Sequence, residues 1–247
     1  MTAARAPARP DAVEDAARSA LLGVMDPELD RSLVELGFAR ATSRSSGHIT
    51  VELRLPTYWC APNFVFLMAQ DAQDAVARVP GVRSVDVQVV DHFAGDEITG
   101  ALRDGQGFDE AFGDLADGGG LEELRRIFLV KAFTRRQEQL VRRLLAAGWE
   151  AEDVTSARLG DLRFDEPEAA GELAAYVAKR AALGLGTDRA DRFAVMPDGT
   201  PLAAGLLRSW LRRARSTRIS VDSNTALCQG LYSTRYGSQE DEEEART

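Results

Sequence analysis

Cysteine and histidine are both scarce in this chain of 247 residues. It has two of each, which excludes a disulfide framework and a four-cysteine zinc site within one chain. No run approaches the roughly 18 apolar residues that a membrane helix needs, and residues 1–10 lack the apolar core of a secretory signal. We therefore expect a cytoplasmic protein that does not associate with membranes, with its thiols reduced.

Basic residues are also in the minority. The 39 acidic residues outnumber the 30 lysines and arginines, so that the net charge is -9. Binding to nucleic acid or to an anionic membrane requires a basic surplus, so neither is expected as a partner. The content of 45% hydrophobic and 28% charged residues is typical of a globular protein.

Hydrophobic periodicity in the first hundred residues predicts five elements, in the order helix, strand, strand, helix, strand. They span residues 11–24, 33–41, 48–55, 63–79 and 82–90. The polar turn at residues 43–47 would join the first two strands as a hairpin, and Asn63 is the expected N-cap of the second helix. A hairpin with a covering helix and a returning strand predicts an α+β domain over residues 12–98.

The remainder of the chain is predicted to be mainly helical. The predicted segments are a disordered lead-in at 1–11, a Gly/Asp-rich linker with one short helix at 99–120, a mainly helical domain at 121–237 and an acidic tail at 238–247. Helices are expected over residues 121–147, 166–183 and 202–215, with Gly148 as the residue that ends the first. The predicted fold class is therefore α+β, a small α-β-β-α-β N-terminal domain followed by a mainly α-helical second domain.

Cys60 lies at the predicted junction between a strand and a helix, within PTYWCAP at residues 56–62. The dipole and the unpaired amides of a helix N-terminus favour thiolate over thiol. Thiolate is the form that binds soft metals and iron–sulfur clusters. The alternative is that Cys60 is a small buried hydrophobic residue. Trp59 beside it is either a packed residue or an exposed anchor for a partner protein.

Several motifs in this region, taken in order, resemble the SufT/PaaD-like family of iron–sulfur cluster assembly domains. They are DPE at 26–28, LVELGF at 33–38, PTYWCAP at 56–62 and PGVRSVDVQV at 80–89, and the resemblance covers residues 12–98. It implies that Cys60 is the functional thiol, that Asp26 and Glu28 lie in the loop facing it, and that iron or an iron–sulfur cluster binds there transiently. The resemblance also implies that Thr57 forms a hydrogen bond near the thiolate. The PaaD branch also has a cysteine-rich zinc segment at its C-terminus, which this sequence lacks.

His92, near the end of the last predicted strand, is a further candidate metal ligand. Each of these residues also has a structural alternative: a turn for Asp26 and Thr57, a solvent-exposed charge for Glu28, and a structural histidine at position 92. One cysteine, one histidine and two acids cannot provide the four cysteines of a closed cluster in a monomer. A bridged homodimer, or a cluster shared with a client protein, would be required.

No acid–base pair and no nucleophile with a partner base is evident, so we expect a non-catalytic factor rather than an enzyme. Its expected function is to aid delivery or assembly of iron or an iron–sulfur cluster in a client metalloenzyme. The resemblance to PaaD implies a multicomponent diiron monooxygenase as the client, and a chaperonin is another candidate partner. One alternative is a scaffold or chaperone for an oxygenase complex that does not need the thiol.

A second alternative is a DNA-binding regulator with a helix-turn-helix. Residues 137–162 have that outline, and Arg142, Arg143 and Arg158 could contact phosphates. A second arginine cluster occupies residues 208–218. For both clusters the exposed face of an arginine-rich helical domain is the favoured interpretation, because helix pairs joined by turns are common. Residues 220–237, which include Cys228, predict only an ordered loop or an interaction surface.

Overall fold

The computed structural model of the protein describes residues 10–113 and 120–237. Contacts between residues divide the chain into an N-terminal unit, residues 1–121 with 224–247, and a helical unit, residues 122–223. Most of the predicted lead-in (1–9), part of the predicted linker (114–119) and the predicted acidic tail (238–247) lie outside the described residues.

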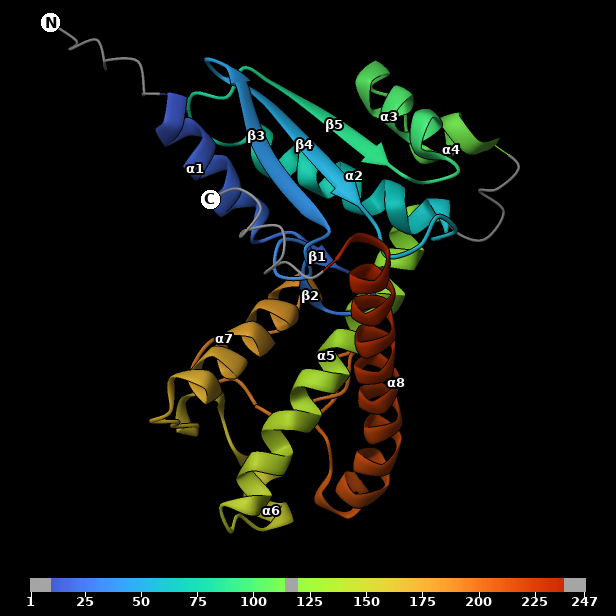
Figure 1. The fold of residues 1–247 in the computed structure, drawn as a ribbon. Coiled ribbons are helices and arrows are strands. Elements are labelled where there is room, and N and C mark those ends of the chain that lie inside the picture. The colour runs from blue at the N-terminus through green and yellow to red at the C-terminus, as the bar shows by residue number, and fades with distance from the viewer. Residues whose placement is uncertain (1–9, 114–119, 238–247) are drawn as a thin grey trace, which may run out of the picture. The chain divides into compact units, whose positions relative to one another are not determined.

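The N-terminal unit alternates helices with short strands (Figure 1). Its elements are α1 (Pro10–Leu21), β1 (Met25–Asp26), β2 (Arg31–Ser32), β3 (Ala39–Ser45), β4 (His48–Arg54), α2 (Pro62–Ala77), β5 (Ser84–Val90), α3 (Gly95–Asp104) and α4 (Phe108–Phe112). The predicted order of helix, hairpin, helix and strand is present, with the two-residue strands β1 and β2 added after α1. The predicted α+β class, with a mainly helical second part, is confirmed.

Strands β3, β4 and β5 form one sheet in that order. The pair β3 and β4 is the predicted antiparallel hairpin, whereas β5 runs parallel to β4, with Arg54 opposite Val90 at their ends. A parallel pair needs a crossover, and α2 provides it. Because parallel strands end at the same edge of a sheet, the loop that follows β4 and the loop that follows β5 are neighbours.

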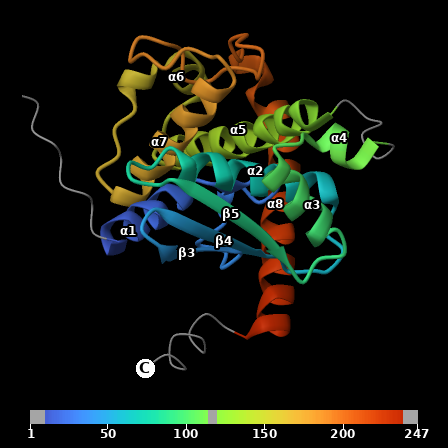
Figure 2. The same cartoon turned by 90° about the horizontal axis from the view of Figure 1, so that it is seen from above.

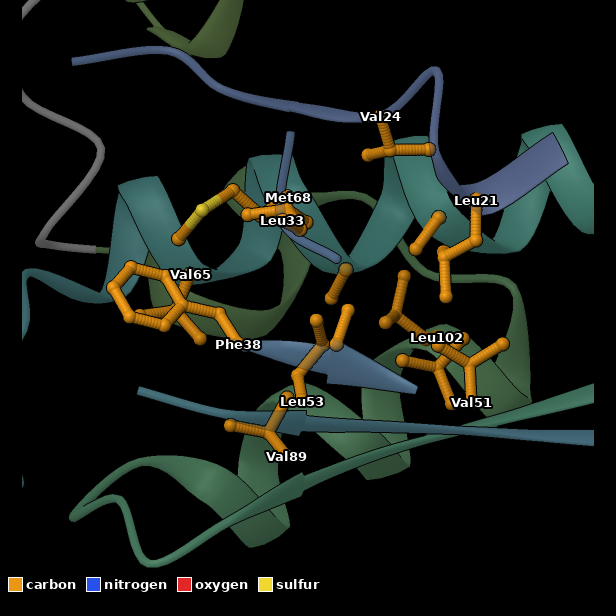
Figure 3. Packing of buried hydrophobic residues seen from close by; sticks show 14 of the residues in the cluster. Leu21, Val24, Leu33, Phe38, Val51, Leu53, Val65, Met68, Val89 and Leu102 are labelled. Atoms are coloured by element: carbon orange, nitrogen blue, oxygen red, sulfur yellow. The ribbon is translucent and has the colours of Figure 1, made fainter. Parts of the chain in front are cut away.

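Helices α1 and α2 pack on the sheet, α1 on β3 and α2 on β5, and α3 lies along β5 (Figure 2). Figure 3 shows the apolar core between them, with Phe38, Val65 and Met68 close together and Leu53 near Val89. Each of these side chains is at most 6% exposed, and burial of one such side chain contributes about 1.5–3 kcal/mol. This core fixes the ends of β4, β5 and α2, where the candidate site lies.

The structure differs from the prediction at residues 33–41, where a strand was expected. Strand β3 begins only at Ala39, and Leu33, Leu36 and Phe38 are buried in a turn before it. Gly37 has a φ of 78° in this turn, a left-handed conformation that glycine adopts without steric cost. The buried residues Leu33, Leu36 and Phe38 are three and two positions apart, which fits a turn. The prediction of a strand over residues 33–41 did not take this spacing into account.

The structure also differs over part of the predicted linker. Residues 95–104 form the helix α3, and its Ile98, Ala101 and Leu102 are buried in the core of the N-terminal unit. Their spacing of three and one places them on one helical face. The glycine and charged residues around them had obscured this short apolar stripe in the sequence.

The helical unit contains most of α5 (Gly120–Ala146), then α6 (Ala151–Ser156), the 3-10 helix η2 (Leu159–Asp161), α7 (Pro167–Ala182) and the first part of α8 (Ala204–Tyr236). Gly148 follows α5 with a φ of 90°, in agreement with its predicted role. Helix α8 was expected to end near residue 215 but continues to Tyr236, so residues 220–236 are helical rather than a loop. Within the described ranges, no helix is long and apolar enough to span a membrane.

Candidate functional site

Cys60 lies in the loop between β4 and α2, immediately before the residue that caps the helix. Helix α2 begins at Pro62, and Ala61 is its N-cap, with an extended backbone and no side-chain hydrogen bond to the helix. The predicted cap, Asn63, is therefore inside the helix. Proline at the first helical position needs no donor and favours helix initiation. The sequence therefore starts α2 at a fixed point and places the half-buried Cys60 thiol at its N-terminal end.

Two side chains hold Cys60 in position. The hydroxyl of Thr57 lies 3.2 Å from the sulfur, as expected from the resemblance, and it also accepts a hydrogen bond from the amide of Trp59. The Nε2 atom of His92, from the loop after β5, lies 2.7 Å from the carbonyl oxygen of Cys60. Neighbouring strand ends thus place two loops against one cysteine.

The ring of His92 uses both of its nitrogens in contacts with the backbone. Its Nδ1 accepts from the amide of Ala94 at 3.2 Å, so that Nε2 carries the proton and donates to Cys60. Burial lowers the pKa of His92, opposed by the bond to Cys60 and reinforced by the charge of Arg235. In this arrangement His92 contacts the backbone of the loop that carries the thiol, and its role as a metal ligand stays a prediction.

Asp26, at the end of β1, organises the turn that follows it. Its Oδ1 accepts hydrogen bonds from the amides of Glu28 and Leu29, both at 2.9 Å. The residue is 8% exposed. Burial raises the pKa of Asp26 to about 6, with the two backbone hydrogen bonds opposing this rise and the charge of Glu28 adding to it. A carboxylate that is costly to ionise thus lies beside the candidate site.

Glu28 reaches a segment that sequence reasoning had not connected with the site. Its Oε1 accepts a hydrogen bond from Nδ2 of Asn224, at 2.9 Å, in the part of α8 that belongs to the N-terminal unit. Four residues further on, Cys228 packs against the same apolar core as Cys60. Burial raises the pKa of the Cys228 thiol to about 11, and the charges of Asp26, Cys60 and Glu28 contribute in that order.

The structure therefore joins the turn of Asp26 and Glu28 to the helix that carries Cys228, through Asn224. It places Thr57 on the sulfur of Cys60 and His92 behind its backbone. Across residues 10–113 and 120–237, no three His, Cys, Asp or Glu side chains are arranged as ligands of a metal ion. Sequence reasoning did not connect Cys228 with this part of the chain. The signal available in the sequence was the repeat of Asn224, Cys228 and Tyr232 at intervals of four, which marks one face of a helix.

Three aromatic side chains form an exposed cluster next to Cys60. Trp59 is 74% exposed, and Tyr58 and Phe93 are also exposed. The ring centroid of Trp59 lies 4.9 Å from that of Tyr58 and 5.5 Å from that of Phe93, and the amide of Phe93 donates to the carbonyl of Tyr58. Trp59 is thus exposed rather than packed, and its role as an anchor for a partner protein stays a prediction.

The arginines of the helix-turn-helix alternative are engaged within the helical unit. Arg143 forms two hydrogen bonds to the carboxylate of Glu172, at 2.7 and 3.2 Å, and Arg158 donates to the carbonyl of Ala190. The second helix of the outline is the six-residue α6, followed by a 3-10 turn. This geometry offers no long recognition helix of the kind that enters a DNA groove.

The similarity of this chain to known proteins lies in the part that contains Cys60. The sequence model of the family described as iron-sulfur cluster assembly protein matches residues 14–89. A relative, the iron-sulfur cluster carrier protein of Synechocystis sp., is 40% identical over 75 residues, which is 30% of this chain and 21% of the relative. The chain thus spans about a fifth of the length of this curated relative.

The matched segment runs from α1 to β5 and includes Asp26, Glu28, Thr57 and Cys60. The N-terminal part of the chain therefore matches an iron–sulfur cluster assembly domain, which confirms the recognition made from the motifs. His92 and Cys228 lie beyond the matched residues.

Proposed function

We propose that this chain is a non-catalytic accessory factor that receives iron or an iron–sulfur cluster at Cys60 and delivers it to a client metalloenzyme. The observation that carries this proposal is the half-buried Cys60 thiol at the N-terminal end of α2, 3.2 Å from the Thr57 hydroxyl. A thiolate in that place is a ligand for iron and its clusters. The family and the relative to which residues 14–89 are similar support the same cargo.

The cargo is proposed to bind transiently. Among the described residues no group of three or more His, Cys, Asp or Glu side chains is placed to hold a metal ion, and the Cys60 loop is held by a hydrogen bond from His92 to its backbone. A cluster with four thiolate ligands is retained, whereas one with ligands missing is readily passed on. The missing ligands would come from the client or from a second copy of this chain in a homodimer. Reduced thiols are required, which fits the cytoplasm.

The exposed cluster of Tyr58, Trp59 and Phe93 supports docking of a client protein beside the thiol. Exposed tryptophan and tyrosine are the residue types that most often anchor protein interfaces. By the resemblance to PaaD, the client would be the subunits of a multicomponent diiron monooxygenase, with a chaperonin as the other candidate.

We expect Trp59→Ala to weaken capture of the client by about tenfold or more, because an interface anchor of this kind contributes upwards of about 2 kcal/mol. The matched control is Leu206→Ala, which removes another exposed apolar side chain, from α8 within the helical unit. Capture would be measured by surface plasmon resonance with purified monooxygenase subunits. Equal losses for the two variants would contradict docking at the aromatic cluster.

The thiol is tested by co-expressing the client with the wild-type chain, Cys60→Ser or Cys60→Ala, and measuring the iron content and activity of the purified client. Serine retains the size of cysteine but loses most of its affinity for soft metals, so both variants should yield a client that lacks iron. If both variants mature the client normally, the chain is a scaffold that does not need the thiol. Circular dichroism of the variants would establish that they fold.

A further inference from the structure

The last part of α8 is fastened to the loops that surround Cys60. Asn224, Cys228 and Tyr232 are four residues apart, so they lie on one face of the helix. Asn224 donates to Glu28 at 2.9 Å, and the Tyr232 hydroxyl donates to the carbonyl of Gly37 at 2.6 Å. Cys228 is therefore held between two anchored positions.

Other contacts hold the same segment of α8 one and two turns after Cys228. The Tyr232 ring lies 5.2 Å from the ring of Phe38. Arg235 donates to the carbonyl of Asp91, next to His92, at 2.9 Å. Figure 1 shows the end of α8 beside β1 and β2. Thus the segment contacts the DPE turn, the LVELGF turn and the loop that orients Cys60.

From this placement we propose that Cys228 is a second thiol of the Cys60 site, so that two sulfur ligands from opposite ends of the sequence bind one soft or borderline metal cargo. The inference rests on the proposed function and names a ligand that the matched residues 14–89 do not include. Both cysteines are free and half-buried, and both pack against the same apolar core.

The charges around Cys228 are those that attract a cation. Glu28 of the DPE turn accepts from Asn224, one turn before Cys228, and Asp26 lies in the same turn, so two carboxylates lie near this stretch of α8. Arg235 lies two turns after Cys228 on its own helix. A soft or borderline cation binds the thiolate form of cysteine, and the thiol proton leaves to solvent as the metal–sulfur bond forms.

Two thiols are also the number that suits transfer. They supply half of the four thiolates that an iron–sulfur cluster takes. The other half would be free for a donor or client protein. The alternative is that Cys228 is only a small buried hydrophobic residue. In that case an apolar side chain of similar size at position 228 should leave metal binding unchanged.

The test is titration of the full-length chain with Cd²⁺, followed by the thiolate-to-cadmium charge-transfer absorbance. We expect one site per chain in the wild type, with the absorbance of two thiolates. Cys228→Ser and Cys228→Ala should each halve the absorbance and weaken Cd²⁺ binding by roughly tenfold or more, since loss of even an outer partner of a ligand costs that much. Ser233→Ala, at an exposed position on the same helix, is the matched control and should bind as the wild type does. Unchanged affinity and absorbance in both Cys228 variants would overturn the proposal.

A second measurement uses the wild-type chain and does not depend on the folding of a variant. Dibromobimane alkylates two thiols, releasing bromide at each, and becomes strongly fluorescent only when it links two that are close together. We expect the linked product between Cys60 and Cys228 in the folded chain. If each thiol reacts separately and no link forms, the proposal is wrong. Neither measurement involves the client, so a two-thiol site would stand even if client maturation proved independent of Cys60.

Discussion

Replacing Asp26 with asparagine is expected to stabilise the N-terminal unit at neutral pH. The carboxyl group is 8% exposed, and its burial raises the pKa from 3.8 to about 6. Because a group with a raised pKa binds its proton more tightly in the folded state, ionisation of Asp26 opposes folding. At about 1.36 kcal/mol for each pKa unit, the full penalty is about 3 kcal/mol above pH 6 or so and vanishes below about pH 4.

Asparagine keeps the oxygen that accepts from the amides of Glu28 and Leu29. It removes the buried charge but makes those two hydrogen bonds weaker. We therefore expect a net gain of about 1–3 kcal/mol at about pH 7.5 and almost none at about pH 4. The assay is hydrogen exchange of β4 and β5 peptides by mass spectrometry, which reports on the N-terminal unit by itself.

Asp86→Asn is the matched control, because its pKa is shifted the other way. Burial raises the pKa of Asp86, but hydrogen bonds from Gln88 and Arg103 outweigh this and lower it. Asparagine at position 86 should cost stability at neutral pH. If Asp26→Asn also destabilised the unit at neutral pH, the charge of Asp26 would be favourable to folding, and the reasoning from burial would be refuted.

Variants at three further positions probe the contacts around the thiol. Thr57→Val removes the hydroxyl 3.2 Å from the sulfur and should slow alkylation of Cys60 by iodoacetamide severalfold, and an unchanged rate would exclude a hydrogen bond to the sulfur. His92→Ala leaves the Cys60 carbonyl without its donor and should lower the free energy of unfolding in urea by about 1–3 kcal/mol. His92→Gln should recover part of this loss, and an equal loss in both variants would contradict the positioning role. Tyr232→Phe loses the bond to Gly37 and should cost about 1 kcal/mol, seen as faster exchange at the end of α8, while unaltered exchange would show that this anchor is not needed.

Local patterns in the sequence were enough to predict the strands and helix that frame the site. Residues 48–54 and 84–90 alternate in polarity as β4 and β5 do, and the helix predicted from residue 63 begins one residue earlier, at Pro62. Cys60 was identifiable because its place depends only on these neighbours. Its hydrogen bond with Thr57 lies within the same short loop.

Contacts between distant parts of the chain could not be predicted in this way. The contribution of His92 depends on the parallel pairing of β4 with β5, which no local pattern reveals. Cys228 reaches the site only because α8 continues as a helix through a segment rich in serine, threonine and asparagine. Such residues have weak helix propensity, and the tertiary contacts of Asn224 and Tyr232 outweigh it.

The most direct measurement of the central claim is reconstitution of the purified chain with iron and sulfide without oxygen, followed by transfer to an apo-ferredoxin. Mössbauer spectroscopy would give the cluster content per chain, and ferredoxin absorbance would give the transfer rate. The account predicts that the wild-type chain binds and passes on a cluster, whereas Cys60→Ser, folded to the same extent, does neither. Equal cluster content and equal transfer by Cys60→Ser would contradict it.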